Sequence, residues 1–446
     1  MKGQSLRIGS GAGFAGDRIG PAVELAERGG LDDLVLECLA ERTIAAGQLR
    51  RMRDPQHGYD PLLRRRLEAL LPITAARGTR VITNMGAANP LAAGQVARGI
   101  AGEHGLALRI GVVTGDDVLE NIDLDAPALE DGRPIAEHGE VISANAYLGA
   151  DAIVPALVSG ADLIITGRVS DPSLFLAPLA ERLGWDLDDW QLAARGTMIG
   201  HLLECAGQIT GGYFADPGRK DVSDLARLGF PFADVRADGS AEISKLAGTG
   251  GLVNRSTVRE QLLYEVTDPS AYVTPDVQLD LRQASVREIG PDRVAVGGAM
   301  GRPRPDQLKV SVGYHAGFRS EAEISYVGPN ALARARLAGE IVAQRLRGVG
   351  IDVRLDVVGS IGIDEQGIDD LRNHECRLRV AALGDRAQAD DVCHEVEALY
   401  TNGPAGGGGV RTSVTEVIGI VSTYIHRAAV TPRLTLLESG DTNAPA

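Results

Sequence analysis

Two adjacent carboxylates stand out first among the residues that could do chemistry. Asp116 and Asp117 occur together in the run TGDD. Paired carboxylates can share a proton for acid–base work or hold a divalent cation. The alternative is that both are ordinary turn and capping residues. The pair predicts a catalytic role, and with Asp171 as a third ligand it would suit Mg²⁺ or Mn²⁺.

A second candidate group lies in the run TGRVSDPS. The forked guanidinium of Arg168 suits a carboxylate or phosphate, so we predict that it binds the substrate. Asp171 follows three residues later and could act in catalysis. The alternative interpretation is a structural Arg–Asp pair, with Asp171 capping a helix before Pro172. We place Gly167 in the same binding loop.

The run GHLLECAGQITGG contains a histidine and a glutamate with helical spacing. His201 and Glu204 are three residues apart and therefore share one helix face. His201 could serve as a general base, although a buried histidine is more often held by packing alone. The helix leads into Gly211 and Gly212, which would allow a ligand to approach the backbone closely. We predict catalysis by His201 and substrate binding by the other three.

Asparagines in two further runs, NMGAANP and NAYLGA, could hold a substrate oxygen. We predict that Asn84 and Asn145 orient the carbonyl on which an enolate develops. Gly86 and Asn89 are predicted to line the same site. Asn89 has a second interpretation, as the N-cap of a helix whose first residue is Pro90.

The glycine-rich run GSGAGFAGD follows the first apolar segment. Its Gly11-x-Gly13-x-x-Gly16 spacing matches a dinucleotide fingerprint, with Glu37 as the ribose ligand. A plainer interpretation is a helix N-terminus that binds an anion, with Asp17 nearby. The remaining alternative is a tight turn capped by Asp17. We place Gly13, Gly16 and Asp17 among the substrate-binding residues.

The elements that must position these residues are short apolar strands separated by helical stretches. The expected strands are Leu6–Gly9, Leu34–Leu39, Arg80–Thr83, Leu108–Val113, Val141–Ala144 and Leu163–Thr166. Such alternation predicts βαβ units, a mostly parallel sheet and helices on its faces. Crossovers are right-handed, so the carboxyl ends of the strands share one edge, where ligands bind in open α/β sheets. The candidate residues should therefore gather at that edge.

The rest of the chain has a different pattern of strands and helices. We expect an α/β domain over residues 1–215, an irregular connection over 216–255, and a second domain over 256–440. The second domain has the strand and helix pattern of an α+β, ferredoxin-like fold. The tail, residues 441–446, is expected to be disordered.

Composition narrows the class of protein. The 446 residues carry a formal net charge of −15, which makes nucleic acid an unfavourable partner. No stretch has the length and apolarity of a membrane span or a signal peptide, so we expect a cytoplasmic protein. A homo-oligomer is expected only from the general habit of cytosolic enzymes.

Taken together, these motifs resemble the acyclic terpene utilisation (AtuA) family. The resemblance runs through RIGSGAGFAGD, LDDLVLECLAE, NMGAANP, TGDD, NAYLGA, ITGRVSD, GHLLECAGQITGG, GTGGLV, TPDV and GRPRPDQLKV. Two motifs depart from it, because members usually carry SGFWGD and NAGGxNP where this chain has GAGFAGD and NMGAANP. Many members also extend into a small C-terminal domain, so a separate small partner protein could supply it here.

The resemblance implies the breakdown of branched acids as their CoA thioesters. We therefore expect an enzyme acting on a hydroxylated or unsaturated carboxylic acid or its CoA thioester by lyase or hydro-lyase chemistry. CoA would enter as part of the substrate, and no separate cofactor is firmly indicated. One alternative is a nicotinamide- or flavin-dependent oxidoreductase. Another is a non-catalytic acyl-binding subunit that works with the small partner protein.

Overall fold

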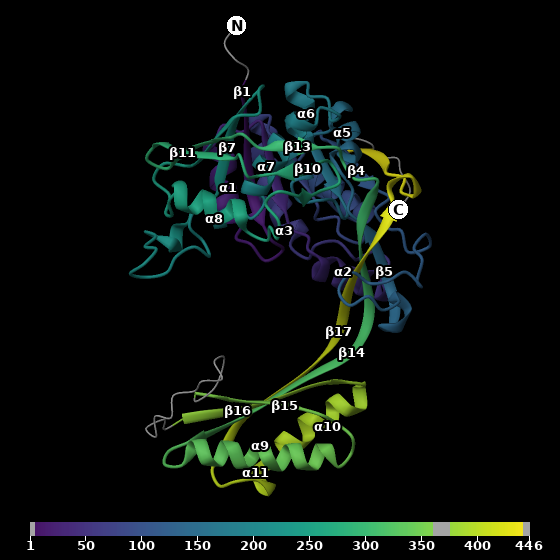
Figure 1. Ribbon diagram of the computed structural model, residues 1–446, viewed down its shortest axis with the longest axis vertical. Helices are drawn as coiled ribbons and strands as arrows, with labels where there is room; N and C mark the ends of the chain where they lie inside the picture. Colours follow the sequence, from purple (N-terminus) through teal and green to yellow (C-terminus); the bar gives the residue numbers. More distant parts are fainter. Residues whose placement is uncertain (1–4, 360–374, 440–446) are drawn as a thin grey trace. The chain divides into compact units, whose positions relative to one another are not determined.

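The computed structural model describes residues 5–359 and 375–439, and the chain forms two compact units (Figure 1). Unit 1 contains Met1–Glu137, Val141–Gly313 and Ile420–Ala446. Unit 2 contains His138–Glu140 and Tyr314–Gly419. The expected division at 216–255 therefore differs from the observed one, because the second unit is inserted within the chain of the first.

A parallel core forms the centre of the large sheet in unit 1. Its strands run in the order β1 (Ser5–Gly13), β2 (Asp33–Glu37), β3 (Arg80–Thr83), β6 (Leu163–Thr166) and β4 (Arg109–Thr114). All residues of β2 and β6 are buried, which is typical of parallel strands covered on both faces. The predicted mostly parallel sheet is confirmed, and four of its strands fall within a few residues of their predicted bounds.

Antiparallel strands extend this sheet on both sides to ten strands. The additional strands are β7 (Pro231–Arg236), β8 (Ala241–Lys245), β12 (Arg293–Gly297) and β11 (Ser285–Gly290) beyond β1, and β18 (Arg433–Glu438) beyond β4. The region 216–255 is thus not only an irregular connection, because it supplies β7 and β8. Its turn residues obscured two short strands in the sequence.

Helices cover both faces of the parallel core. The helices α1 (Gly20–Arg28), α3 (Leu63–Arg77) and α4 (Pro90–Glu103) pack on one face, and α5 (Ala150–Val158), α6 (Ser173–Leu183) and α7 (Trp190–Leu203) pack on the other. Strand residues alternate between the two hydrophobic cores, as Ile164 does against Leu163 and Ile165.

The two helical layers create a topological switch point. The neighbouring strands β3 and β6 are followed by α4 and α6, which lie on opposite faces of the sheet. The loops after these strands therefore diverge, and open α/β sheets bind ligands at such points.

The strand that was expected over Val141–Ala144 lies outside the large sheet. It forms β5 (Glu140–Ala146), which pairs with β14 (Gln307–Val327) instead. Its first three residues are exposed or only partly buried, unlike those of a strand inside a parallel core. Unit 1 also contains α2 (Glu41–Arg53), α8 (Arg255–Leu263) and a small sheet of β13 (Met300–Arg302), β10 (Gln278–Asp280) and β9 (Tyr272–Val273).

Unit 2 is built around one antiparallel sheet with its helices on the same face (Figure 1). Its elements are α9 (Ala331–Arg347), β15 (Arg354–Val358), β16 (Glu375–Gly384), α10 (Arg386–Glu397) and α11 (Leu399–Asn402), with the part of β14 from Tyr314 and the part of β17 (Gly407–His426) up to Gly419. The sheet order is β15-β16-β14-β17. Its core joins residues of β14, β16, α9 and α10. The ferredoxin-like plan stays a prediction, and the tail at 441–446 lies outside the described residues. No helix within the described ranges has the length and apolarity needed to cross a membrane.

Candidate functional site

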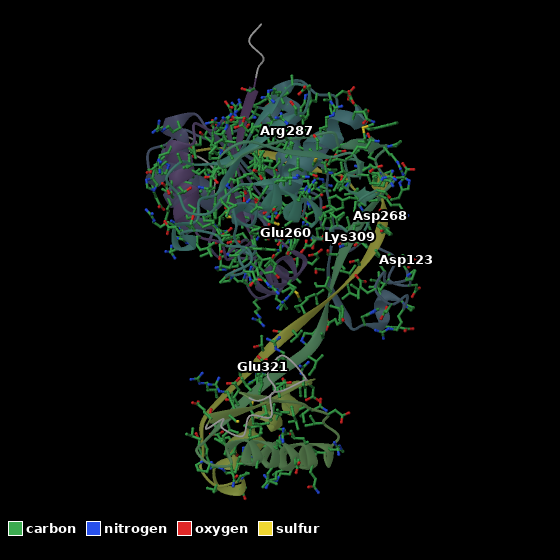
Figure 2. All side chains as sticks on the ribbon, turned by 60° about the vertical axis from the view of Figure 1, so that its left-hand side comes forward. Asp123, Glu260, Asp268, Arg287, Lys309 and Glu321 are labelled. Atoms are coloured by element: carbon green, nitrogen blue, oxygen red, sulfur yellow. The ribbon has the colours of Figure 1, made fainter. Side chains whose placement is uncertain are left out.

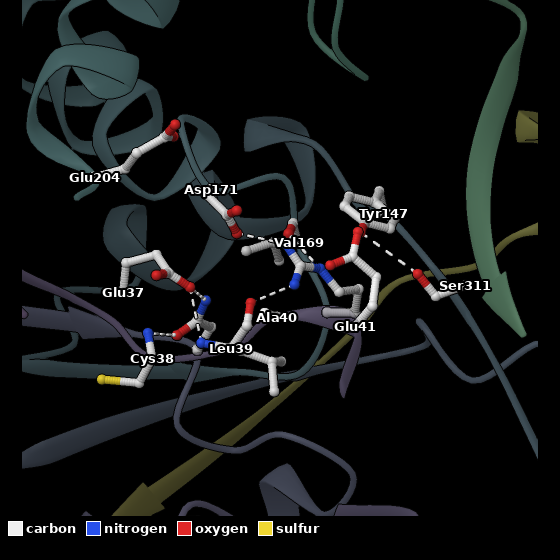
Figure 3. Close-up of polar contacts among 12 residues, drawn as sticks. Glu37, Cys38, Leu39, Ala40, Glu41, Tyr147, Val169, Asp171, Glu204 and Ser311 are labelled. Atoms are coloured by element: carbon white, nitrogen blue, oxygen red, sulfur yellow. Dashed lines mark hydrogen bonds and ion pairs between the residues drawn. The ribbon is translucent and has the colours of Figure 1, made fainter. Parts of the chain in front are cut away.

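Arg168 lies at the switch point, directly after β6, and its side chain is 1% exposed. Its Nε donates to the carbonyl of Val169 at 3.0 Å, and its terminal nitrogens bond to the carbonyl of Leu39 and the carboxylate of Asp171 (Figure 3). The guanidinium carbon lies 4.2 Å from the ring centroid of Tyr147. Neighbouring carboxylates raise its pKa further, against the effect of burial. A fixed buried cation therefore organises this edge of the sheet.

Glu37 and Asn84 form a second layer beside Arg168. One oxygen of Glu37 accepts from Asn84 Nδ2 at 2.9 Å and from the backbone N–H of Leu39 at 2.8 Å. The Asn84 Oδ1 accepts from the N–H of Cys38 at 2.7 Å, so both ends of this amide are engaged by protein. Burial raises the pKa of Glu37 well above its usual range, and the nearby Asp171 raises it further. Asn84 thus orients Glu37 rather than presenting a free amide.

Asp171 is the member of this group with access to solvent, because 34% of its side chain is exposed. The rest of the side chain is buried, and this burial raises its pKa to about 7. Arg168 opposes this shift, whereas the carboxyl groups of Glu204 and Glu41 add to it. A partly exposed carboxyl group that titrates near neutrality is suited to proton transfer.

Asp116 is buried and holds the backbone of Arg168 through a hydrogen bond. It is 4% exposed, and its Oδ2 accepts from the backbone N–H of Arg168 and from Asn145 Nδ2, both at 2.9 Å. Burial raises its pKa to about 6. A Cβ on Gly167 would lie 2.5 Å from Asp116 Oδ1, so only glycine fits between the two strand ends. Asn145 therefore acts as a hydrogen-bond donor inside the protein.

The three carboxylates expected as metal ligands do not fit that role. Asp117 points away from its neighbour, with half of its side chain exposed and Arg51 at 3.6 Å. Asp116 is held by N–H donors, and Asp171 is paired with Arg168. Among the described residues, no three His, Cys, Asp or Glu side chains are grouped as a metal site would require. We derive no step through a metal ion.

Four further residues that the sequence did not single out surround the other side of Arg168. The hydroxyl of Tyr147 donates to Glu41, and Ser311 Oγ lies 3.4 Å from that hydroxyl (Figure 3). Lys309 Nζ lies 3.4 Å from Glu41; this lysine, labelled in Figure 2, comes from β14. Burial opposes ionisation of Glu41, but Tyr147 and Arg168 together lower its pKa to about 2. The only signal in the sequence was Tyr147 inside NAYLGA.

The predicted His201–Glu204 pair forms on α7. His201 Nδ1 and Glu204 Oε1 are 2.9 Å apart, with 2% and 11% of their side chains exposed. Burial lowers the pKa of His201, but Glu204 outweighs it and the net shift is upward. Burial raises the pKa of Glu204. Its Oε2 is buried and has no hydrogen-bond partner in the described parts of the chain. A buried unpaired oxygen of this kind calls for a functional explanation or a bound water.

The predicted binding glycines mostly serve close packing. A Cβ on Gly13 would lie 2.3 Å from the carbonyl carbon of Cys205, and one on Gly86 would lie 2.4 Å from the carbonyl oxygen of Thr166. Gly13 also donates its N–H to Asp17 at 2.9 Å. Backbone from the end of α7 therefore occupies the space over the glycine loop, which does not favour a dinucleotide there.

Other predicted residues hold loops together. Asn89 is the N-cap of α4 and accepts from the N–H of Ala92 at 3.3 Å, in line with its alternative interpretation. Asp17 does not cap α1, which begins at Gly20, and instead fixes the glycine loop. Gly211, at φ +108°, packs against Val222, and Gly212 packs against the carbonyl of Gly207.

A cavity of about 270 Å³ opens at the carboxyl edge of β1, β2 and β3. It is lined by Ala15, Gly16, Cys38, Leu39, Thr43, Ala46, Arg50, Asp60, Pro61, Leu62 and Ala87. Leu39 connects this cavity to Glu37 and Arg168, because its backbone N–H donates to Glu37 and its carbonyl accepts from Arg168. Gly16 is thus the predicted glycine that does line a cavity.

Comparison with known protein families identifies the family of this chain. A family model described as "Acyclic terpene utilisation family protein AtuA" matches residues 6–436. No curated protein and no solved structure matches the chain. The match covers nearly the whole chain, including Arg168 and every residue that contacts its side chain. The chain therefore belongs to the acyclic terpene utilisation (AtuA) family.

Proposed function

We propose that the chain is an enzyme of acyclic terpene utilisation that acts on a hydroxylated or unsaturated carboxylic acid or its CoA thioester by lyase or hydro-lyase chemistry. The observation that carries the proposal is Asp171 at the switch point. It is partly exposed, its pKa is raised to about 7, and the buried Arg168 fixes it in place. A general base that removes a proton next to a carbonyl group works best when its pKa lies near the operating pH.

The geometry supports an elimination in which two carboxyl groups divide the work. Asp171, ionised, accepts the proton from the carbon next to the carbonyl group. Glu204, whose pKa burial raises, donates a proton to the leaving β-hydroxyl through its unpaired Oε2. Water leaves, the carbon–carbon double bond forms, and hydration is the reverse. The cation of Arg168 offsets the negative charge that develops on the carbonyl oxygen.

The remaining predicted residues take supporting roles in this scheme. His201 holds Glu204 through the 2.9 Å contact, and Asp116 holds the backbone of Arg168. Asn84 and Asn145 hold Glu37 and Asp116. We propose them as positioning residues, because each holds a neighbouring group through these contacts.

The test is the reversible dehydration of branched 3-hydroxy acids and their CoA thioesters, followed by the absorbance of the conjugated product. Asp171→Asn should lower kcat/KM by roughly 10²–10⁴, the usual contribution of a general base. The matched control is Asp224→Asn, because Asp224 forms an exposed pair with Arg227 at the same i,i+3 spacing. Asp224 has φ +50°, which asparagine tolerates.

Each outcome decides between the candidate functions. Turnover by the wild type and by Asp224→Asn, with loss in Asp171→Asn, supports the proposal. Equal turnover in all three would move the chemistry away from Asp171. Binding of the thioester with no turnover would favour the acyl-binding subunit, and a spectral change on adding NADH would favour the oxidoreductase.

A further inference from the structure

The cavity beside β1–β3 contains an incompletely paired cation. Arg50 lines this cavity, and its guanidinium donates to the carbonyl of Tyr59 at 3.4 Å, a long contact. Among the described residues no carboxylate pairs with it within 4 Å, and Asp60, in the same lining, acts on it only at longer range. By contrast, the neighbouring Arg66 is buried and bonds to three backbone carbonyls and to Cys38 Sγ. Arg50 therefore retains N–H donors for an anion.

The rest of the wall is mostly apolar. Ala15, Leu39, Ala46, Pro61, Leu62 and Ala87 supply hydrocarbon surface. Ala46 and Arg50 come from the same face of α2, four residues apart, so one helix presents both the apolar floor and the charge. Cys38, Thr43 and Asp60 also line the cavity, and the carboxylate of Asp60 lies 3.8 Å from Arg66 Nη1. Because Asp60 is paired with Arg66, Arg50 remains the cation of the lining without a close partner. This charge beside hydrocarbon surface matches a molecule with one carboxylate and a hydrocarbon chain.

The volume sets the size of that molecule. At about 30 Å³ for each water-sized group, a cavity of about 270 Å³ holds roughly ten non-hydrogen atoms. This accommodates a medium-length acid and is too small for a whole CoA thioester.

We infer that this cavity binds a free aliphatic carboxylate of medium chain length, with the carboxylate on Arg50 and the chain along Ala46 and Leu39. The assignment of this acid as the substrate or product rests on the function proposed above. Leu39 supports the link, because its side chain lines the cavity while its backbone holds Glu37 and Arg168.

Calorimetric titration with octanoate and a methyl-branched octanoate tests the inference directly. The wild type should bind both. It should bind butyrate and octanol at least about tenfold more weakly, because butyrate lacks the long chain and octanol lacks the carboxylate. Arg50→Gln should weaken octanoate binding about tenfold or more. Ala46→Phe, which fills the cavity, should abolish it.

Arg65→Gln is the matched control, since Arg65 is an exposed arginine on α3 outside the cavity lining. It should bind octanoate as the wild type does. Circular dichroism and Tm identify any variant that fails to fold, and Ala46→Phe tests the cavity without touching the charge. Equal octanoate affinity in the wild type, Arg50→Gln and Ala46→Phe would overturn the inference, as would tighter binding of octanol than of octanoate.

Turnover separates this inference from the proposed function. Octanoate binding that depends on Arg50, without any dehydration activity, would contradict the proposed reaction but support the carboxylate site. Dehydration of 3-hydroxy acids at wild-type kcat and KM by Arg50→Gln and Ala46→Phe would support the reaction. The same result would overturn the cavity as the binding site of its substrate.

Discussion

The guanidinium of Arg168 lies 4.2 Å from the ring centroid of Tyr147, whose hydroxyl donates to Glu41. The arginine therefore contacts an aromatic ring and also donates to the carboxylate of Asp171. This arrangement holds a desolvated cation at the switch point, and the pKa values of three surrounding carboxyl groups depend on it.

Replacing Arg168 with methionine should destabilise the fold strongly. The substitution leaves the carbonyl of Leu39 without its hydrogen bond and removes the partner of Asp171. Breaking a buried charged pair typically costs about 3–5 kcal/mol, and here the partial exposure of Asp171 points to the lower end. Urea denaturation measures the change. Arg227→Met, at an exposed pair of the same spacing, should leave the midpoint unchanged. Equal midpoints for both variants would contradict this account of Arg168.

Tyr147→Phe separates the ring from the hydroxyl. The ring can still lie under Arg168, but Glu41 loses its donor, so its pKa should rise from about 2. The lost hydrogen bond should cost about 1 kcal/mol. Carboxyl-carbon NMR titration of Glu41 reports the first effect and thermal unfolding the second. Tyr424→Phe, at a tyrosine whose side chain is largely exposed, is the control. An unchanged Glu41 titration would show that Tyr147 does not set this pKa.

The pH profile of the proposed reaction should follow Asp171. As a base, Asp171 works when ionised, so kcat/KM should rise with pH and level off above about 7. Asp171→Asn should remove this limb. Lowering the positive charge nearby should raise the pKa of Asp171, so Arg168→Met, where it folds, should shift the limb to higher pH. A limb that persists in Asp171→Asn would assign it to another group.

Asp116 should make stability depend on pH. Its pKa in the folded protein is raised to about 6, above its unfolded value. A raised carboxyl pKa stabilises the fold at low pH, and that stabilisation is lost as the pH rises from about 4 to about 6. The loss should be on the order of 2–3 kcal/mol. Asp116→Asn, whose Oδ1 can still accept from Arg168 and Asn145, should lack this dependence.

The check for Asp116 is urea denaturation of the wild type and the variant at pH 4.5 and pH 7, both conditions chosen to bracket the titration. The free energy of unfolding should fall more steeply with pH in the wild type. Parallel pH dependence in the two proteins would show that Asp116 is not the titrating group.

The sequence by itself determined the parallel core and one contact between side chains. Arg80–Thr83 and Leu163–Thr166 were predicted with their observed bounds, because a buried strand shows itself as a continuous apolar run between turn signals. The contact of His201 with Glu204 was predictable because helical spacing fixes which side chains share a face. The gathering of polar residues at one edge followed from the handedness of the crossovers.

Only the tertiary structure decided which of those polar residues work together. Asp116 and Asp117 are adjacent in sequence yet point apart, because neighbouring side chains in extended backbone alternate in direction. Lys309 reaches Glu41 from a strand in another part of the chain, and no local pattern marks such a partner. The burial of Arg168, and with it the pKa of Asp171 near 7, depends on how β2, β5 and β6 pack, which spacing along the chain does not encode.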